Sequence, residues 1–275
     1  MTAGVVGVIA NKGGVGKTTT SFELACESAH RGLRVLAIVA DRQADLTRLC
    51  GYSRTETMRG LDAILWDPPA SLEARPYVSS VRPGFDLIRS SDALEEAANR
   101  IQSFGNAASL FLERALTPLM PEYDLMVIDL GHRSKLTRTV AAIAHLIVMP
   151  CVPAPLDAEH AGDILAQAGE FRRELGLPRV DVLNRSFISL WHRTRNGASE
   201  GRFDELLRER YPNQVYPAAI PNSVRIAEAQ AQRMSLREYR DAVGHQRDKS
   251  LNAMIDAYSQ LTDFALDRLS QGALA

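Results

Sequence analysis

The chain has 275 residues, of which 45% are hydrophobic and 24% are charged, a balance typical of a globular protein with a sizeable core. A formal net charge of −1 gives no overall field that would attract nucleic acid or a membrane. No apolar stretch approaches the ~18 residues needed to span a bilayer, and the three cysteines show no metal-ligand spacing. These features predict a soluble protein of the reducing cytoplasm.

Short apolar runs alternate with longer helical patterns along the chain. The predicted strands cover residues 5–10, 35–40, 85–89, 125–129, 146–151, 180–183 and 218–220. The predicted helices cover residues 18–31, 91–103, 107–119, 158–175, 203–209 and 249–269. Such alternation indicates parallel βαβ units with helices on both faces of the sheet. We therefore predict a single α/β domain over residues 1–275, with a doubly wound, mostly parallel sheet and the last helix packed on it.

A glycine-rich segment between the first strand and the first helix has the composition of a phosphate-binding loop. Its end, Gly-Val-Gly-Lys-Thr, matches the motif, whereas Asn11 stands where the motif begins with glycine. The glycines can turn backbone N–H groups toward anionic oxygens, and the following helix directs its positive end at the same oxygens. Lys17 would reach the β- and γ-phosphates, and the Thr18 hydroxyl would ligate Mg²⁺. The residues predicted to bind the nucleotide are Lys12, Gly13, Gly14, Val15, Gly16, Lys17, Thr18 and Thr19.

Two aspartates stand at the ends of apolar strands. Asp129 ends the run Leu-Met-Val-Ile-Asp, which is the Walker B pattern, and it is predicted to hold Mg²⁺ together with Thr18. Asp41 follows the strand at 35–40, and ligands bind at the carboxyl ends of strands in such sheets. Asp41 is therefore predicted to orient the water that attacks the γ-phosphate. For both residues the alternative is a structural aspartate that caps the next turn.

Four segments, in the same order, resemble the ParA/MinD family of ATPases with a deviant Walker A motif. They are Lys-Gly-Gly-Val-Gly-Lys-Thr-Thr-Thr at 12–20, Asp-Arg-Gln-Ala-Asp-Leu-Thr at 41–47, Tyr-Asp-Leu-Met-Val-Ile-Asp at 123–129 and Ile-Pro-Asn-Ser-Val-Arg-Ile-Ala-Glu-Ala at 220–229. The last segment is similar to the corresponding segment of partition ParA proteins. The early position of the loop resembles the small ParA type, which has no N-terminal DNA-reading domain.

The resemblance implies an ATPase that requires ATP and Mg²⁺ and forms a homodimer around the bound nucleotides. It implies that Lys12 contacts the phosphates of the partner subunit, whereas Lys17 and Asp41 act in their own site. These three residues are the implied catalytic residues. Adenine would lie near Asn184 and Pro221. A ParB-like or adaptor protein would stimulate the slow hydrolysis.

Several positions depart from the family pattern. Val39, Arg42 and Asp45 replace the usual Asp, Pro and Asn, and Leu-Gly-His at 130–132 replaces x-Pro-Pro after the Walker B strand. In the family, the segment after the Walker B strand responds to the nucleotide state. The replacement at 130–132 therefore leaves open how this chain switches between nucleotide states and how fast it hydrolyses ATP. His132 is either a catalytic acid or a structural loop histidine.

Residues 185–250 contain 12 Lys and Arg against 8 Asp and Glu, a local excess of four positive charges. Two copies of this surface in a dimer would bind DNA phosphates without sequence preference. The resemblance favours Arg225, Arg247 and Lys249 as the residues that face DNA. The alternative is a solvated face, because acidic residues are interleaved with the basic ones.

We therefore predict a ParA-like ATPase that associates with the nucleoid and positions a plasmid, a chromosome or a protein assembly. A MinD-like membrane-cycling ATPase is the alternative, and it needs a basic amphipathic helix at a terminus. Residues 263–275 contain one arginine and two aspartates, so no membrane partner is expected. A metallocluster reductase would need cysteines that share a cluster, and Cys151 alone follows the Walker B strand.

Overall fold

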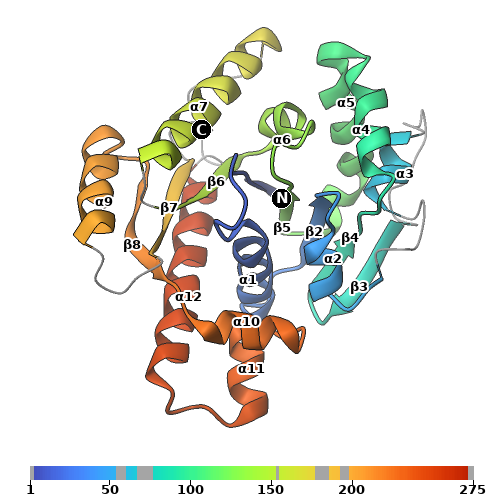
Figure 1. The fold of residues 1–275 in the computed structure, drawn as a ribbon. Helices are drawn as coiled ribbons and strands as arrows, with labels where there is room; N and C mark the ends of the chain where they lie inside the picture. Colours follow the sequence, from blue (N-terminus) through green and yellow to red (C-terminus); the bar gives the residue numbers. More distant parts are fainter. Residues whose placement is uncertain are drawn as a thin grey trace.

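The computed structural model of the chain describes residues 3–53, 60–66, 77–152, 155–176, 186–192 and 198–271. Its strands form one eight-stranded sheet with the order β3-β4-β2-β5-β1-β6-β7-β8, and helices cover it (Figure 1). The strands are β1 (Gly4–Val8), β2 (Val35–Ala40), β3 (Val78–Arg82), β4 (Phe85–Ile88), β5 (Leu125–Leu130), β6 (Leu146–Cys151), β7 (Phe187–His192) and β8 (Val215–Pro221).

The helices connect these strands and extend the chain beyond the last one. They are α1 (Lys17–His30), α2 (Asp45–Leu49), α3 (Leu61–Trp66), α4 (Leu94–Gln102), α5 (Ala108–Leu116), α6 (Thr137–Ile143), α7 (Pro155–Glu174), α9 (Ala198–Arg210), α10 (Val224–Ala231), α11 (Leu236–Val243) and α12 (Lys249–Ser270). Two 3₁₀ helices, η2 (Gly105–Ala107) and η3 (Thr117–Glu122), flank α5. Within the described ranges, no helix combines the length and the apolar character of a membrane span.

The predicted doubly wound α/β fold is confirmed. Neighbouring strands run parallel except for the β3–β4 pair, which is antiparallel. The connection from β1 to β2 crosses β5 in one direction, and the connection from β5 to β6 crosses β1 in the other. The register pairs Val8 of β1 and Val39 of β2 with Asp129 of β5, so these three strands end at the same edge of the sheet. Loops that follow them therefore meet at one place.

The central strands are fully buried because their sequences are apolar on both faces. In β2, Leu36 and Ile38 pack into one hydrophobic cluster, whereas Val35, Ala37 and Val39 pack into the other. This alternation follows from the period of two along a strand. The sheet thus separates two cores, and each core is closed by its own layer of helices (Figure 1).

The sequence located most elements within a few residues, and strands β2 and β6 have the predicted bounds. The edge strand β3 was missed because its half-exposed residues, Val-Ser-Ser-Val-Arg, contain no apolar run. The short helices α2, α3, α6, α10 and α11 and the strand β7 were also missed. The predicted strand at 180–183 lies outside the described residues, and β7 begins only at Phe187.

Helix α1 holds the C-terminal helices against the sheet through polar contacts along its length. The buried carboxyl group of Glu23 accepts a hydrogen bond from the backbone N–H of Leu236 at 3.1 Å. Glu27 accepts two hydrogen bonds of 2.9 Å from the guanidinium of Arg237. At the end of α1, Arg31 donates to the Ser259 carbonyl of α12 at 2.8 Å. The α10–α11 segment is therefore fixed to the helix that follows the glycine-rich loop.

Burial raises the pKa of Glu23 to about 8, from a usual value of 4.5. Between these values the folded protein keeps a proton that the unfolded chain loses, so stability should fall as the pH rises. Because of this residue, we expect the free energy of unfolding to fall by up to about 1.4 kcal/mol for each pH unit as the pH rises from 5 to 8. Urea unfolding across this range should show a flatter pH dependence in Glu23→Gln, which keeps an acceptor for Leu236.

The exposed Glu113 provides a matched control, because Glu113→Gln removes a carboxylate that water already solvates. This variant should keep the pH dependence of the parent protein. An equal slope in Glu23→Gln and the parent would contradict the assignment of a buried, protonated carboxyl at position 23.

Candidate nucleotide-binding site

The glycine-rich loop joins β1 to α1 and leaves the start of the helix open. Gly14 and Gly16 have φ angles of 72° and 85°, which a side chain would strain. A Cβ atom at Gly13 or Gly14 would meet no atom within 4 Å, so the loop borders open space. Gly16 is the N-cap of α1, and no side chain caps the first N–H groups. These N–H groups can therefore bind an anion.

The Lys17 ammonium lies inside this loop. It donates a hydrogen bond to the backbone carbonyl of Lys12 at 2.9 Å, which links the two lysines of the motif. Burial lowers the pKa of Lys17, and the carboxylates of Asp129 and Asp41 oppose this effect. The site thus brings a buried cation and two acids to the edge where β1, β2 and β5 end.

The Asp129 carboxylate is bound to the first turns of α1. Thr18 donates its hydroxyl to one carboxylate oxygen at 3.1 Å, and Ser21 donates to the other at 2.8 Å. Burial raises the pKa of Asp129 to about 7, although the hydrogen bonds from Ser21 and Thr18 oppose the increase. A nearby cation would stabilise the carboxylate form of this fully buried group. The hydroxyl and carboxylate oxygens are hard donors of the kind that Mg²⁺ prefers, so Thr18 and Asp129 fit the predicted magnesium site.

Asp41 faces the same region from the end of β2. One of its carboxylate oxygens accepts a hydrogen bond from the Gln43 backbone N–H at 2.9 Å, so this residue does cap its own turn. It also lines the pocket beside the glycine-rich loop. Gly131 packs directly on it, since a Cβ atom at that position would lie 2.6 Å from the Asp41 oxygen. The structural role and the predicted catalytic position are therefore compatible.

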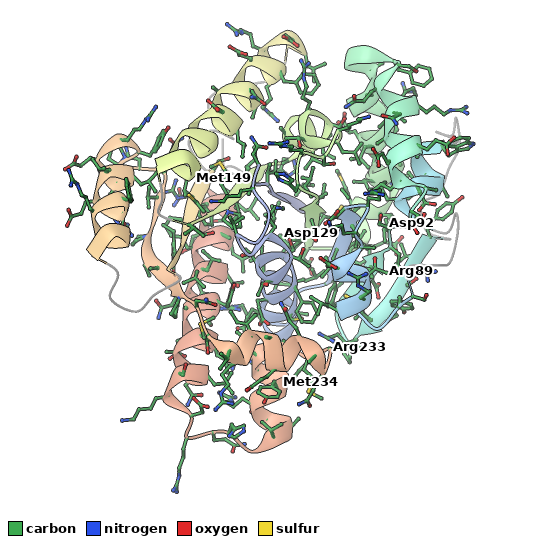
Figure 2. The ribbon with its side chains drawn as sticks, in the orientation of Figure 1. Arg89, Asp92, Asp129, Met149, Arg233 and Met234 are labelled. Atoms are coloured by element: carbon green, nitrogen blue, oxygen red, sulfur yellow. The ribbon has the colours of Figure 1, made fainter. Side chains whose placement is uncertain are left out.

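The pocket at the loop has a volume of about 560 Å³. Among the residues predicted from sequence, its lining contains Gly13, Gly14, Gly16, Lys17, Thr18, Thr19 and Asp41. The lining also contains Gln43, Asp45, Arg48, Leu49, Gln230, Ala231 and Arg233, which were not predicted to bind the nucleotide. It further contains His132, for which the sequence left a catalytic and a structural role open. Figure 2 labels two of the positions that define the region, Asp129 at the end of β5 and Arg233 at the end of α10.

Five further residues predicted for the nucleotide and magnesium sites lie away from this lining or outside the description. Lys12 and Asp129 are not part of the lining, but they are hydrogen-bonded to its residues Lys17 and Thr18. The Val15 side chain is buried in the hydrophobic core, so only its backbone is available to a ligand. Pro221 ends β8 and is not part of the pocket wall. Asn184 lies outside the described residues. Gln230 and Arg233 lie just after the Ile-Pro segment at 220–229. Their proximity to this segment was the one feature of the sequence that could have indicated a place near the nucleotide.

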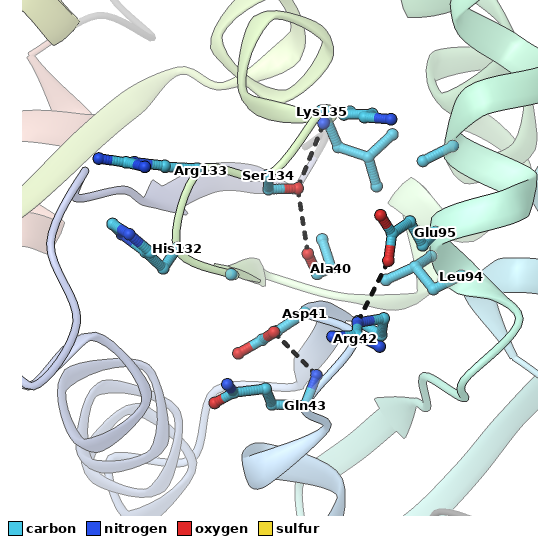
Figure 3. Close-up of a pocket in the computed structure, with 13 residues that line it drawn as sticks. Ala40, Asp41, Arg42, Gln43, Leu94, Glu95, His132, Arg133, Ser134 and Lys135 are labelled. Carbon is cyan, nitrogen blue, oxygen red and sulfur yellow. Dashed lines mark hydrogen bonds and ion pairs between the residues drawn. The ribbon is translucent and has the colours of Figure 1, made fainter.

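A second pocket, of about 260 Å³, adjoins the first at Asp41 (Figure 3). It brings together the two segments that depart from the family pattern. Arg42 pairs with Glu95 at 3.3 Å, and the Ser134 hydroxyl donates to the Ala40 carbonyl at 3.4 Å. The loop after β5 therefore contacts the end of β2, whereas the loop after β2 contacts α4.

His132 belongs to both pockets. Desolvation in the pocket and the positive charges of Lys17 and Arg133 lower the pKa of this exposed imidazole. A lowered pKa argues against a role of this side chain as a general acid at neutral pH.

The three residues favoured for DNA binding differ in their surroundings. Arg225 pairs with Glu228 and Asp248 at 2.7 Å each, so its charge is neutralised within the chain. Arg247 and Lys249 are exposed beside the start of α12.

A protein-family model described as an AAA domain matches residues 3–176. The chain is 31% identical over 221 residues to the chromosome-partitioning ATPase Soj of Thermus thermophilus, covering 79% of this chain and 81% of the relative. It is 30% identical over 179 residues to a putative replication protein A of Sinorhizobium fredii, covering 60% of this chain and 43% of the relative.

A further relative is the maintenance of carboxysome distribution protein A of Synechococcus elongatus, with 32% identity over 139 residues. This alignment covers 50% of this chain and 54% of the relative. The chain thus spans about half the length of the replication protein and of the carboxysome distribution protein. Among solved structures, an ATP complex of a Cyanothece McdA variant superposes with a TM-score of 0.75 at 20% identity, covering 94% of this chain and 95% of that chain.

The contact between Gly131 and Asp41 gives a direct test of the site. Gly131→Ala should displace the Asp41 carboxylate, because the new Cβ atom would lie 2.6 Å from its oxygen. We expect the rate of ATP hydrolysis to fall by roughly tenfold or more while ATP binding is kept, since the phosphate loop is untouched. Steady-state phosphate release and equilibrium binding of a fluorescent ATP analogue measure the two effects.

Asp41→Ala provides the reference for this loss, and combining the two substitutions should add little to either alone. Gly201→Ala is the matched control, because a Cβ atom at Gly201 meets nothing within 4 Å. Full activity in Gly131→Ala would contradict the position assigned to Asp41.

Proposed function

We propose a specific cycle for this chain, which belongs to the ParA family of ATPases: it binds ATP with Mg²⁺, dimerises around the nucleotides and hydrolyses ATP slowly. The match to the family model and the relation to the Soj ATPase support ATP as the nucleotide. The observation that carries the proposal is the pairing of Thr18 and Asp129, 3.1 Å apart, beside the buried Lys17. One loop and one strand end thus supply the donors for a phosphate and for its magnesium ion.

The residues would divide the work as follows. Lys17 and the loop N–H groups would bind the phosphates and neutralise charge that develops in the transition state. Thr18 and Asp129 would hold Mg²⁺, which would act as a Lewis acid and withdraw charge from the phosphate. Asp41 would orient the attacking water. Lys12, at the start of the loop, would extend toward the nucleotide of a second copy of the chain.

The lysine pair tests this cycle. Lys17→Ala should abolish binding of a fluorescent ATP analogue, because it removes the buried cation from the phosphate loop. Lys12→Ala should keep most of the affinity of the monomer but lose the dimer that forms with ATP, as measured by light scattering. Equal loss of monomer binding in the two variants would place Lys12 in its own subunit's site and would contradict the trans role.

We further propose that the dimer binds DNA without sequence preference. The exposed Arg247 and Lys249 support this role, whereas Arg225 has to be released from Glu228 and Asp248 before it can contact a phosphate. A dimer would present each of these cations twice on one surface. Because the monomer has a formal net charge of −1, binding should depend on dimerisation.

Salt dependence provides the measurement. If a dimer neutralises about six phosphates, log K should fall with log[salt] at a slope near −5, or roughly a thousandfold between 50 and 200 mM salt. Arg247→Ala and Lys249→Ala should each weaken binding equally on unrelated duplexes and make the slope shallower by roughly one to two units. Arg225→Ala should have a smaller effect because its charge is already paired.

The Asp41→Ala protein with ATP is the form to use, since slow hydrolysis should hold the dimer together. Its failure to retard any duplex at 50 mM salt would exclude the DNA proposal. Sedimentation of the same protein with anionic liposomes would support a membrane-cycling ATPase instead.

The names of two relatives support a proposal for the cellular role. One is named a chromosome-partitioning ATPase and another a carboxysome distribution protein, which supports a role in positioning a cargo. We propose that the dimer associates with the nucleoid in the cytoplasm and that a ParB-like or adaptor protein stimulates hydrolysis and releases it. The cargo is then a plasmid, a chromosome or a protein assembly that the partner protein selects.

A further inference from the structure

Arg233 differs from the other arginines of the α10–α11 segment in its electrostatic surroundings. The others form internal ion pairs, namely Arg225 with Glu228 and Asp248 (2.7 Å each), Arg237 with Glu27 (2.9 Å) and Arg240 with Asp241 (2.9 Å). Within the described ranges, the Arg233 side chain makes no ion pair and no hydrogen bond. It is exposed, so its charge is available to a ligand.

The backbone at Arg233 has a conformation that favours glycine. Its φ angle is 57°, in the left-handed region. The Arg233 N–H donates to the Gln230 carbonyl and the Met234 N–H donates to the Ala229 carbonyl, both at 3.0 Å, which together form the Schellman motif at the end of α10. Glycine is the usual residue at this position because a side chain there strains the backbone. Helix termination alone would therefore favour glycine over arginine.

Tertiary contacts hold this helix end beside the glycine-rich loop. The Gln230 amide donates to the Thr19 hydroxyl at 2.9 Å, which connects the last turn of α10 to the first turn of α1. Arg82 donates to the Arg233 carbonyl at 3.2 Å and fixes the cap from the other side. As a result, Arg233 lines the same pocket of about 560 Å³ as Gly14 and Lys17.

We propose that Arg233 is a nucleotide-binding residue whose guanidinium contacts the phosphates of ATP in its own subunit. This inference rests on the proposed ATP site and extends it to a cation supplied from outside the phosphate loop. A guanidinium presents forked N–H donors that match phosphate oxygens. An arginine without an internal partner, held in a strained cap on the wall of a phosphate pocket, has this chemistry available. Glycine at this position would relieve the strain and remove the cation.

The strain and the charge predict opposite effects of one substitution. Arg233→Gly should raise the Tm of the ligand-free protein by roughly 2 °C, because the left-handed backbone no longer carries a side chain. The same substitution should weaken ATP binding by roughly tenfold, the usual cost of one charge-assisted hydrogen bond. Thermal unfolding without nucleotide and titration with a fluorescent ATP analogue measure the two effects separately.

Three further variants separate charge from backbone effects. Asparagine tolerates the left-handed region but has no charge, so Arg233→Asn should weaken ATP binding as much as Arg233→Gly does. Arg233→Lys keeps the charge without the fork and should show an intermediate loss. Arg240→Ala, which removes a paired arginine from α11, is the matched control and should bind ATP like the parent protein.

The outcomes distinguish this inference from the function on which it rests. Parent-like ATP affinity in Arg233→Gly would overturn the role of Arg233 while leaving the ATP site intact. Equal weakening in Arg233→Gly and Arg240→Ala would also overturn it, because the effect would then reflect general surface charge. If the parent protein binds no ATP, the proposed function fails and this inference fails with it.

Discussion

The site depends on the buried carboxylate of Asp129, which accepts hydrogen bonds from the Thr18 and Ser21 hydroxyls at 3.1 and 2.8 Å. These two bonds join the end of the central strand β5 to the first turns of α1. They hold the helix end where its free N–H groups and Lys17 face one pocket. A buried carboxylate without such partners would be strongly destabilising. The same interaction that orders the site therefore also makes it suitable for a cation.

Helix α1 extends this arrangement to the C-terminal part of the chain. Its polar residues are buried because α10, α11 and α12 cover them, and the contacts of Thr19, Glu23 and Glu27 run along the helix in that order. Arg82 contributes from β3 by binding Glu238 at 3.2 Å as well as the Arg233 carbonyl. Binding at the loop and the position of the α10–α11 segment are thus connected through one rigid element.

The departures from the family pattern are neighbours in space. The segments at 41–45 and 130–132 lie on adjacent strand ends, and Gly131 packs on Asp41 so closely that no side chain fits between them. A change in one segment therefore requires an adjustment in the other. The adjacent residue His132 lines both pockets.

The sequence by itself determined the alternation of strands and helices, the phosphate loop and the two strand-end aspartates, because each depends on local periodicity or on glycine conformations. It also placed most elements within a few residues. Only the tertiary structure brought Gln230 and Arg233 to the loop, since no local pattern records a contact between residues 19 and 230. It likewise decided that Arg225 is paired and that β3 and β7 join the sheet. Charge pairing and edge-strand addition depend on partners that are distant in the chain, and hydrophobic periodicity does not encode them.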